Sequence, residues 1–532
     1  MIRYTISFWQ SMTRPTFEYA DAIPQTGVRS LICKNSYSSF ALLVEASEKS
    51  ENLKIEVADL TKDGAPIEGF AYDVFKIGFV NTPEAGSVAD ILEPVTTFDI
   101  DDKCFIYTRC FVGADAEAGI YDGKVLLTKG GETLAEKEFT LEVANVTVPD
   151  PEEWMFHLNV WMNPGAVAEY YNLPLWSDEH FEMLGKYMDD LAAHGQKAAV
   201  VPICYKPWWA QTHTVYPSTI IWKKTDDGYD FDFSVFDRYV ELYESKGITD
   251  TIHCYSPVQG PGKIDFSEIE FEDGTVEKFF VGTPEYDAVW GAFFTAFRKH
   301  LEETDRFDKT YIALDEKTPE VMEALADFID KYASDFNLAY AGKPDPKYVK
   351  RYSDISYFYT PAKDSDYDGD LEADEGSTES SDILTTFYVC CGPQHPNTFV
   401  HSPLIESRIL PMLAIRGGYN GLLRWSYNDW SESPFVNVSF TPEGCEFPSG
   451  DTFLVYPGPE GPIPSLRWEQ LRQGIQDFEL ASIALINAMS DEDIADYEHA
   501  VNIACRNADD GNKSIGDIEI ARRLLIPIAE DE

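Results

Sequence analysis

The sequence predicts a multidomain chain in which an antiparallel β-sandwich precedes a (β/α)8 barrel and a C-terminal helical extension. Three observations predict it. The length of 532 residues is too great for a single core. Residues 1–148 consist of short β-rich runs separated by turn residues. From Trp154 onward, strand-like and helix-like segments alternate eight times.

The first 148 residues favour a sandwich because their apolar and β-branched residues come in short runs between Gly, Pro and Asp turns. The expected strands are SFALLVEAS, NLKIEVADL, YDVFKIGFV, CFIYTRCFV, YDGKVLLTKG and EKEFTLEVANVTV. The segment Val148–Pro151 (VPDP) has the composition of a linker, so we place the domain boundary there.

Residues 152–460 are expected to form the barrel. Its eight strand candidates are FHLNVW, KAAVVPIC, DTIHCYS, TYIALD, NLAYAG, ISYFYT, LTTFYVCC and GLLRWSY. Helical periodicity fills most of the gaps, and PEVMEALADFIDKY begins at Pro319 with Thr318 as N-cap. The fifth crossover carries only a weak helical pattern. Residues 461–532 are mostly amphipathic and should pack on the barrel as helices.

The charge excludes two classes of partner. The chain carries 92 acidic and 42 basic residues, a formal net charge of −50, which repels nucleic acid and anionic membrane surfaces. The N-terminus lacks a secretory signal and no apolar run reaches the roughly 18–20 residues that span a bilayer, so we expect a cytoplasmic protein. Its substrate would then be a small imported glycan, and the sequence leaves the oligomeric state open.

Neither a metal nor a cofactor is expected. The nine cysteines form no CxxC pair or Cys/His ladder, which indicates free thiols. Residues Asp364–Glu375 match the calcium-loop pattern D-x-D-x-D-G-x5-E, but no flanking helices accompany it. Since residues 364–382 are strongly acidic throughout, a solvated insertion in a barrel loop explains the match better.

Asp315 and Glu316 are the candidate catalytic residues. They end the apolar strand TYIAL, and catalysis in such barrels belongs at the C-terminal strand ends. Burial would raise at least one of the two pKa values, as a general acid requires. The alternative is a solvated strand end or an acidic first helical turn.

Adjacent carboxyls also restrict the mechanism. Ordinary glycosidases place two carboxyls on opposite sides of the scissile bond, roughly 5–9 Å apart. Consecutive residues serve one side, which suits substrate-assisted catalysis: one acid protonates the leaving oxygen while the other orients a 2-acetamido group that attacks the anomeric carbon.

The chain resembles glycoside hydrolase family 123, a family of β-N-acetylgalactosaminidases, from about residue 70 to about residue 480. The similar runs are HFEMLGKYMDDLAAHGQK, PWWAQT, FDFSVFDRYVELYESKGI, HCYS, TYIALDE, TTFYVCC, PNTFVHSPLIES, GYNGLLRWSYNDWSESPF and GDTFLVYPGPEGPIPSLRWEQLRQGIQDFE. The resemblance implies a sandwich before a barrel and a retaining, metal-independent exo-glycosidase. It implies that Asp315 holds the acetamido group and that Glu316 is the general acid and then the base.

The chain departs from the family pattern at two places. Lys317-Thr318-Pro319 stands where the family tends to Arg-Pro, and residues 257–261 (PVQGP) stand where it tends to Pro-Trp. Both segments follow strands at the expected site. They put the preferred sugar and aglycone in doubt and leave the acid pair unchanged.

Further candidates for sugar binding follow other strands. Aromatic faces stack on sugar rings, and polar side chains bind hydroxyls. Tyr255 or Tyr388 could align the acetamido group. Each candidate has a structural alternative: Trp425 and Trp430 as core aromatics, the tyrosines as packing residues, His395 as a structural histidine. The full set is Lys206, Trp208, Tyr255, Tyr388, His395, Trp425, Asn428 and Trp430.

Two other functions remain open from the sequence. A glycosidase of the same fold could act on a sugar without a 2-acetamido group, which requires a third carboxylate as nucleophile. A non-catalytic carbohydrate-binding protein could use the sandwich and an aromatic barrel mouth, although two intact adjacent acids argue against it.

Overall fold

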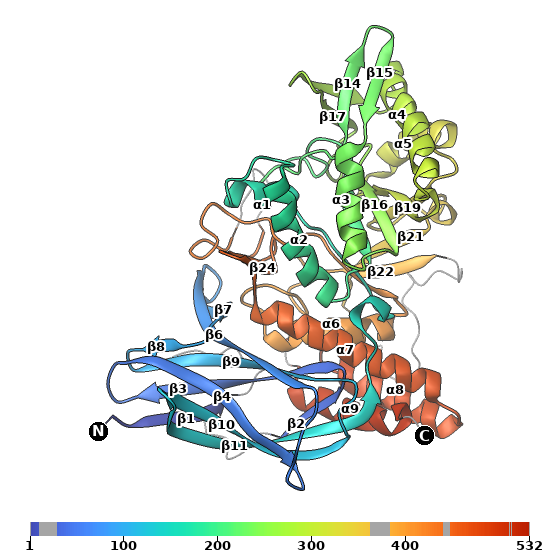
Figure 1. Ribbon diagram of the computed structural model, residues 1–532. Coiled ribbons are helices and arrows are strands. Elements are labelled where there is room, and N and C mark those ends of the chain that lie inside the picture. Colours follow the sequence, from blue (N-terminus) through green and yellow to red (C-terminus); the bar gives the residue numbers. More distant parts are fainter. Residues whose placement is uncertain are drawn as a thin grey trace.

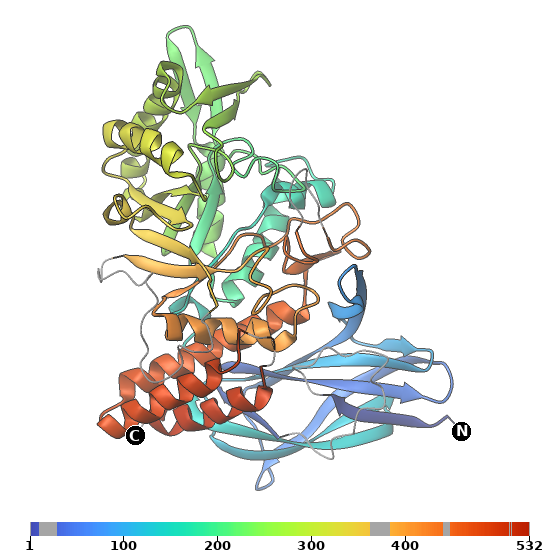
Figure 2. The same cartoon turned by 180° about the vertical axis from the view of Figure 1, so that it is seen from behind.

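Figure 1 shows a computed structural model of the chain, in which residues 2–9, 29–361, 383–439, 447–509, 511 and 513–530 are described. Two β-sheets occupy the N-terminal part, a barrel of parallel strands follows, and three C-terminal helices return to lie between barrel and sheets. Figure 2 shows the same arrangement from behind.

The N-terminal part holds two sheets with a shared core. One five-stranded sheet has the order β1 (Tyr4–Trp9), β3 (Ser36–Ala46), β9 (Lys103–Val112), β6 (Phe70–Thr82) and β7 (Gly86–Pro94). The six-stranded sheet comprises β2 (Arg29–Lys34), β11 (Glu132–Thr147), β10 (Gly119–Lys129), β4 (Ser50–Lys62), β5 (Ala65–Pro66) and β8 (Phe98–Ile100). Strand pairing is antiparallel apart from β2, which runs parallel to β11.

The five-stranded sheet is buried on both faces. Leu42 and Val44 of β3 join a core shared with the other sheet, whereas Ala41 and Leu43 pack with Leu404 and Leu466 from the helical region. Because successive side chains of a strand point to opposite faces, this double burial explains the unbroken apolar run FALLV. All six strands expected here are present.

Eight parallel strands form the barrel, as predicted. Their order is β12 (His157–Val160), β23 (Gly421–Arg424), β22 (Leu384–Tyr388), β21 (Asp354–Phe358), β20 (Asn337–Ala341), β19 (Thr310–Leu314), β16 (Thr251–Tyr255) and β13 (Ala198–Pro202). A bridge between Leu158 and Gln196 joins the two ends of this order. Seven of the eight strand candidates contain one of these strands whole, and β21 begins one residue before its candidate ISYFYT.

Helices and hairpins connect the strands. The hairpins are β14–β15 (Ile221–Thr225 and Gly228–Asp232), β17–β18 (Phe266–Glu270 and Val276–Phe280) and β24–β25 (Val455–Gly458 and Gly461–Pro464). The barrel helices are α1 (Pro164–Tyr170), α2 (Asp178–Ala193), α3 (Ser234–Ser245), α4 (Pro284–Glu303), α5 (Pro319–Tyr332) and α6 (Leu404–Gly417). Between β20 and β21 the chain forms only a single 3-10 turn at Val349–Arg351, in keeping with the weak pattern there.

Helix α5 illustrates how local sequence sets an element. It begins at Pro319 after Thr318, as predicted, although the Thr318 side chain makes no capping hydrogen bond to the backbone. Its apolar stripe, which includes Met322, Leu325 and Ile329, is buried against the barrel. The helix therefore starts four residues after Asp315 and fixes the strand end from outside.

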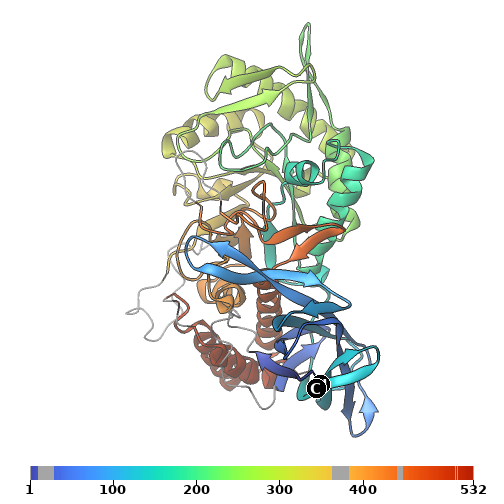
Figure 3. The ribbon, with the colours of Figure 1, turned by 90° about the vertical axis from the view of Figure 1, so that its left-hand side faces the viewer.

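The C-terminal helices form the junction between barrel and sheets. They are α7 (Leu466–Asn487), α8 (Asp491–Cys505) and α9 (Ile515–Ala529). Helix α7 lies against α6, β3 and β7, and Figure 3 shows it beneath the barrel from a third direction. On its surface Arg467 pairs with Asp90 of β7 at 3.1 Å, and both side chains are fully buried.

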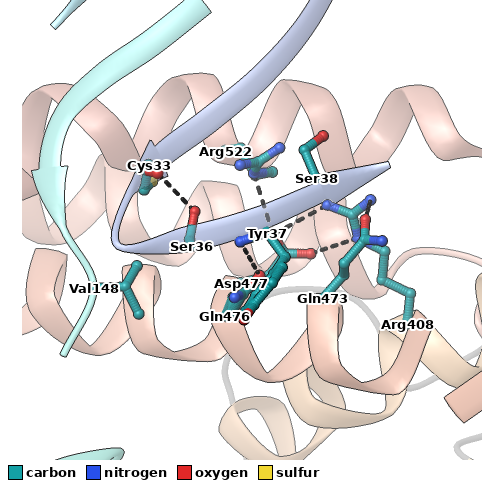
Figure 4. A pocket seen from close by; sticks show the side chains of 10 residues that line it. All are labelled: Cys33, Ser36, Tyr37, Ser38, Val148, Arg408, Gln473, Gln476, Asp477 and Arg522. Carbon is teal, nitrogen blue, oxygen red and sulfur yellow. Dashed lines mark hydrogen bonds and ion pairs between the residues drawn. The ribbon is translucent and has the colours of Figure 1, made fainter. Parts of the chain in front are cut away.

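A small polar pocket lies in the same junction (Figure 4). Asp477 of α7 accepts hydrogen bonds from Arg408 Nε at 2.7 Å and lies 3.1 Å from Arg522 Nε. The lining comes from β2, β3, α6, α7, α9 and Val148, and none of it from the C-terminal strand ends of the barrel. The pocket therefore belongs to the domain junction.

Candidate active site

Two adjacent carboxyls stand at the C-terminal edge of the barrel. Strand β19 ends at Leu314, and Asp315 and Glu316 follow directly. Asp315 Oδ1 accepts the backbone N–H of Glu316 at 2.9 Å. Glu316 is exposed, whereas Asp315 keeps only part of its surface accessible. Glu316 is thus accessible to solvent at this edge of the barrel, and Asp315 is partly accessible.

Burial and, to a smaller extent, the negative charge of Glu316 raise the pKa of Asp315 to about 7. The Glu316 N–H and the positive charge of Lys317 act in the opposite direction. Although some of the residue surface is accessible, protein atoms surround the carboxyl itself. Asp315 therefore exchanges its proton near neutral pH, and the charge of Glu316 helps to set that pKa.

Lys317 fastens a neighbouring loop to the carboxyl segment. Its buried ammonium donates to the carbonyls of Gln259 at 2.5 Å, Gly260, and Ile264 at 3.3 Å. Burial lowers its pKa to about 8. Gly262 adds a backbone bond, its N–H donating to the Glu316 carbonyl at 2.7 Å. The two segments that depart from the family pattern therefore contact each other.

Three tyrosines approach the carboxyls from other strands. The Tyr388 hydroxyl, at the end of β22, donates to Glu316 Oε1. Tyr255, at the end of β16, lies near enough that the charge of Asp315 adds to burial in raising its pKa. The Tyr340 hydroxyl of β20 accepts the Lys317 N–H at 3.2 Å. Tyr255 and Tyr388 were both expected at this site, and Tyr340 was not.

Gly342, which follows β20, leaves room for Glu316. Its φ is +130°, and a Cβ built there would lie 3.3 Å from Glu316 Cγ and 3.3 Å from the Tyr340 hydroxyl. A side chain at this position would strain the backbone and displace the carboxylate.

An aromatic cluster extends the site across the barrel mouth. The Trp161 ring centroid lies 4.8 Å from that of Trp208 and 4.6 Å from that of Tyr255, and Trp208 lies 4.4 Å from Tyr216. On the other side, Trp425 lies 4.9 Å from Phe447. All six rings belong to one buried cluster with Tyr388. Trp208 and Trp425 were expected here, whereas Trp161, Tyr216 and Phe447 were not.

Other expected residues lie elsewhere. Asn428 has no exposed surface, and its side chain bonds the Asn163 backbone at both N–H and carbonyl (2.7 and 3.0 Å). Trp430 donates to the Val455 carbonyl at 2.7 Å and packs on Tyr187. The structure brings neither to the carboxyl pair, because both side chains are used to hold the scaffold.

Lys206 and His395 are also outside the aromatic cluster. The Lys206 backbone has a φ of 51°, and its ammonium lies 5.0 Å from the Tyr205 ring centroid. His395 Nδ1 lies 2.6 Å from Glu406 Oε1, so its ring is held by a carboxylate of α6. Both remain partly exposed.

Asp451 is the further carboxyl beside the cluster. Its Oδ1 accepts Arg424 at 2.7 Å and Trp425 Nε1 at 3.3 Å, and its side chain has no exposed surface. Arg424 and Trp425 both bond Oδ1, whereas Oδ2 has no hydrogen-bond partner. Asp451 therefore positions Trp425, and burial keeps its carboxyl from direct contact with solvent.

Neither a metal-ligand cluster nor a membrane-spanning helix occurs among the described residues. No group of three or more His, Cys, Asp or Glu side chains is arranged to hold a metal ion in those ranges. The calcium-loop pattern at Asp364–Glu375 lies outside them. In the same ranges, no helix combines the length and the apolarity that crossing a bilayer requires.

Comparisons with known proteins point to one family. The family description "Glycoside hydrolase 123, catalytic domain" matches residues 161–484. A solved family 123 glycoside hydrolase from Clostridium perfringens, described in a study of glycolipid glycan hydrolysis, superposes with a TM-score of 0.83 at 22% identity, covering 99% of this chain and 96% of that one.

A GH5 xyloglucanase from Bacteroides ovatus reaches a TM-score of only 0.32 at 8% identity, covering 88% of this chain and 100% of that one. No curated protein matches the chain.

Proposed function

Because the chain belongs to glycoside hydrolase family 123, we propose that it is a retaining exo-glycosidase that removes a terminal β-linked 2-acetamido sugar by substrate-assisted catalysis. The observation that carries the proposal is the arrangement of Asp315 and Glu316, two consecutive carboxyls at one edge of the barrel mouth. Such a pair serves one side of the anomeric carbon, so the nucleophile comes from the substrate.

In the proposed first step, Asp315 accepts the acetamido N–H, and the acetamido oxygen attacks the anomeric carbon. Glu316 gives its proton to the departing glycosidic oxygen, which leaves with the aglycone as an alcohol. The product is a cyclic oxazolinium-like intermediate, whose positive charge the Asp315 carboxylate stabilises. Glu316 then takes a proton from water, which opens the ring with overall retention.

The protonation states of Asp315 and Glu316 support this order of steps. In the free enzyme, burial favours the proton on Asp315, and the Tyr388 hydroxyl donates to Glu316. When the acetamido N–H donates to Asp315, its carboxylate form is favoured and the shared proton moves to Glu316. Substrate binding would thus protonate Glu316, the general acid. Only a sugar with an N–H at this position supplies the donor to Asp315 that causes this transfer.

The remaining groups would enclose the sugar. Tyr255 would hydrogen-bond the acetamido group beside Asp315, and Trp425, the least buried tryptophan of the cluster, would supply an aromatic face to the sugar ring. Trp161 and Trp208 would support the site from within the cluster. The similar clostridial enzyme is described as acting on glycolipid glycans. We include the terminal sugar of such a glycan among the substrates to be tested.

One comparison of substrates tests the mechanism. Aryl β-glycosides of N-acetylgalactosamine, N-acetylglucosamine and galactose share a leaving group and differ in the 2-acetamido group or in one hydroxyl. We expect turnover of an acetamido sugar and little of the galactoside. Comparable rates on the galactoside would remove the substrate-assisted mechanism and require a third carboxylate.

A thiazoline analogue of the intermediate gives a second, binding test. It should inhibit competitively and raise the melting temperature of wild-type protein, because it is bound without turnover. Binding that survives in Asp315→Ala would show that Asp315 does not hold the ring nitrogen.

A further inference from the structure

Two consecutive thiols lie at the rim of the same site. Cys390 and Cys391 follow Tyr388 by two and three residues, and their sulfur atoms are 3.6 Å apart. Cys391 is exposed and Cys390 partly exposed, whereas the other described cysteines are buried: Cys33, Cys104, Cys110, Cys204, Cys254 and Cys505. Within the described ranges, reagents in solution therefore reach this pair first.

The pair borders the groups that surround Glu316. Cys390 packs against the aromatic cluster that contains Trp425 and Tyr388. The loop that carries it is held from below, because buried Asn397 donates to the carbonyls of Cys390 at 2.9 Å and Pro393 at 2.7 Å. A change at either sulfur is thus transmitted to the site rather than absorbed by a loose loop.

The two thiols differ in reactivity. The hydrogen bond from Cys390 lowers the pKa of Cys391, and the same contact together with burial raises the pKa of Cys390. In contrast, burial raises the pKa of Cys104, Cys110 and Cys204 to about 12. Since the thiolate is the nucleophile, Cys391 is the attacking sulfur and Cys390 the neighbour that can resolve an adduct.

We propose that Cys390 and Cys391 form an oxidisable dithiol, which a small-molecule disulfide converts into a vicinal disulfide that lowers hydrolysis at the adjacent carboxyl site. The Cys391 thiolate attacks one sulfur of the reagent, forming a mixed disulfide and releasing one thiol. Cys390 then attacks the Cys391 sulfur and releases the second thiol. The protein loses two electrons and two protons, and the reagent disulfide gains them.

The product should be readily reversible. Consecutive Cα atoms across a trans peptide lie about 3.8 Å apart, below the roughly 4.4–6.8 Å usual for disulfides. The ring is therefore strained, and strained disulfides are the easily reduced, regulatory ones. Closing it draws Cys390 Sγ from 3.6 Å to bonding distance and shifts the β22 end that positions Tyr388.

The reagent should be uncharged. The chain carries a net charge of −50, and Glu316 and Asp451 both act on Cys391, so an anionic disulfide is repelled. Bis(2-hydroxyethyl) disulfide is the probe, and glutathione disulfide is the charged comparison. We expect faster reaction with the neutral reagent. The difference in rate between the two disulfides should become smaller as salt is added.

The experiment uses the full chain with Cys445→Ser, because Cys445 lies outside the described residues. Trypsin releases residues 364–408, which contain Cys390 and Cys391 and no other cysteine. After oxidation this fragment should have lost two hydrogens. Activity should fall about tenfold to 100-fold, the effect of a small displacement at a catalytic group, and dithiothreitol should restore both.

Two variants separate the steps. Cys390→Ser should stop at the mixed disulfide on Cys391, and Cys391→Ser should not react at a comparable rate. Melting temperatures check that both variants fold. The mass of fragment 364–408 from the chain that keeps Cys390 and Cys391 tests the proposal without either variant. The proposal is overturned if the wild-type fragment keeps its hydrogens, if it ends as a lasting mixed disulfide, or if the vicinal disulfide leaves activity unchanged.

Discussion

The Tyr388 hydroxyl donates a hydrogen bond to Glu316 Oε1 from across the barrel mouth. Their strands, β22 and β19, are separated in the sheet by β20 and β21. Glu316 is therefore held by a residue 72 positions away in the sequence as well as by its own segment. This contact, together with the pair Asp315–Glu316, defines the chemistry to be tested.

Replacing each carboxyl should separate the two roles. Glu316→Gln and Asp315→Asn should each lower kcat by about 10²–10⁴, the usual contribution of a positioned acid or base. With a dinitrophenyl leaving group, which departs without protonation, Glu316→Gln should recover its first step and accumulate the intermediate, whereas Asp315→Asn should stay slow. Equal recovery of both variants would contradict the assignment.

Activity should decline as the pH rises through neutrality. Burial and the Glu316 charge raise the pKa of Asp315 to about 7, so Asp315 loses its proton above that value. Leaving-group protonation needs this proton, and kcat/KM should fall above about pH 7. The profile is measured with an alkyl glycoside, whose leaving group requires an acid. A level profile across this range would rule out the shared proton.

Tyr388→Phe should move this fall in kcat/KM, the alkaline limb of the pH profile, to higher pH. The hydroxyl donates to the carboxylate form of Glu316, so its removal makes the pair hold its proton more tightly. Loss of a hydrogen bond to a charged group should lower kcat/KM about tenfold to 100-fold. Tyr427→Phe is the matched control, because Tyr427 donates to Asp190 at 2.5 Å, outside the site. An identical shift in both variants would indicate a general effect on folding.

Lys317→Met should shift the alkaline limb of the kcat/KM profile to higher pH and also lower the melting temperature. The variant removes the positive charge that opposes the rise in the Asp315 pKa, and it leaves the carbonyls of Gln259, Gly260 and Ile264 without their donor. Lys317→Arg keeps the charge but not the compact ammonium. It should retain the pH profile and lose stability, and a profile shift equal to that of Lys317→Met would refute the electrostatic role.

Gly342→Ala should lower kcat about tenfold to 100-fold through displacement of Glu316. The added Cβ would lie 3.3 Å from Glu316 Cγ at a φ of +130°. Gly64→Ala is the control. Gly64 has a φ of +83° in a surface turn, and a Cβ built there would contact no neighbouring atom within 4 Å. Both variants should lose stability through backbone strain, but only the first should lose turnover.

The sequence predicted the strands and helices of the barrel well. Seven of the eight barrel strands and helix α5 lie within their predicted segments, and β21 begins one residue before its segment. The strands β1, β2, β7 and the short hairpins escaped prediction. Strand β7, for example, contains GSVADILEP, whose Asp90 interrupts the apolar pattern because it pairs with Arg467, which lies 377 residues away in the sequence.

The candidate site was only partly predictable. Asp315, Tyr255, Tyr388 and Trp425 lie at strand ends, and Trp208 lies in the loop after β13. The same reasoning would have found Trp161, directly after β12. Asn428 and Trp430 also follow a strand, but their side chains turn to Asn163 and Val455. Local spacing cannot distinguish a residue that faces the mouth from one that ties two loops together.

The buried pair of Asp90 and Arg467 sets a limit on how the enzyme can be shortened. Removing the first 148 residues would take away the counter-ion of Arg467 and leave its guanidinium bonded only to the carbonyls of Thr398 and Gly450. It would also uncover Leu404 and Leu466, which now lie under β3 and β9. The sheets thus serve as the floor of the barrel, and a minimal catalyst has to include them.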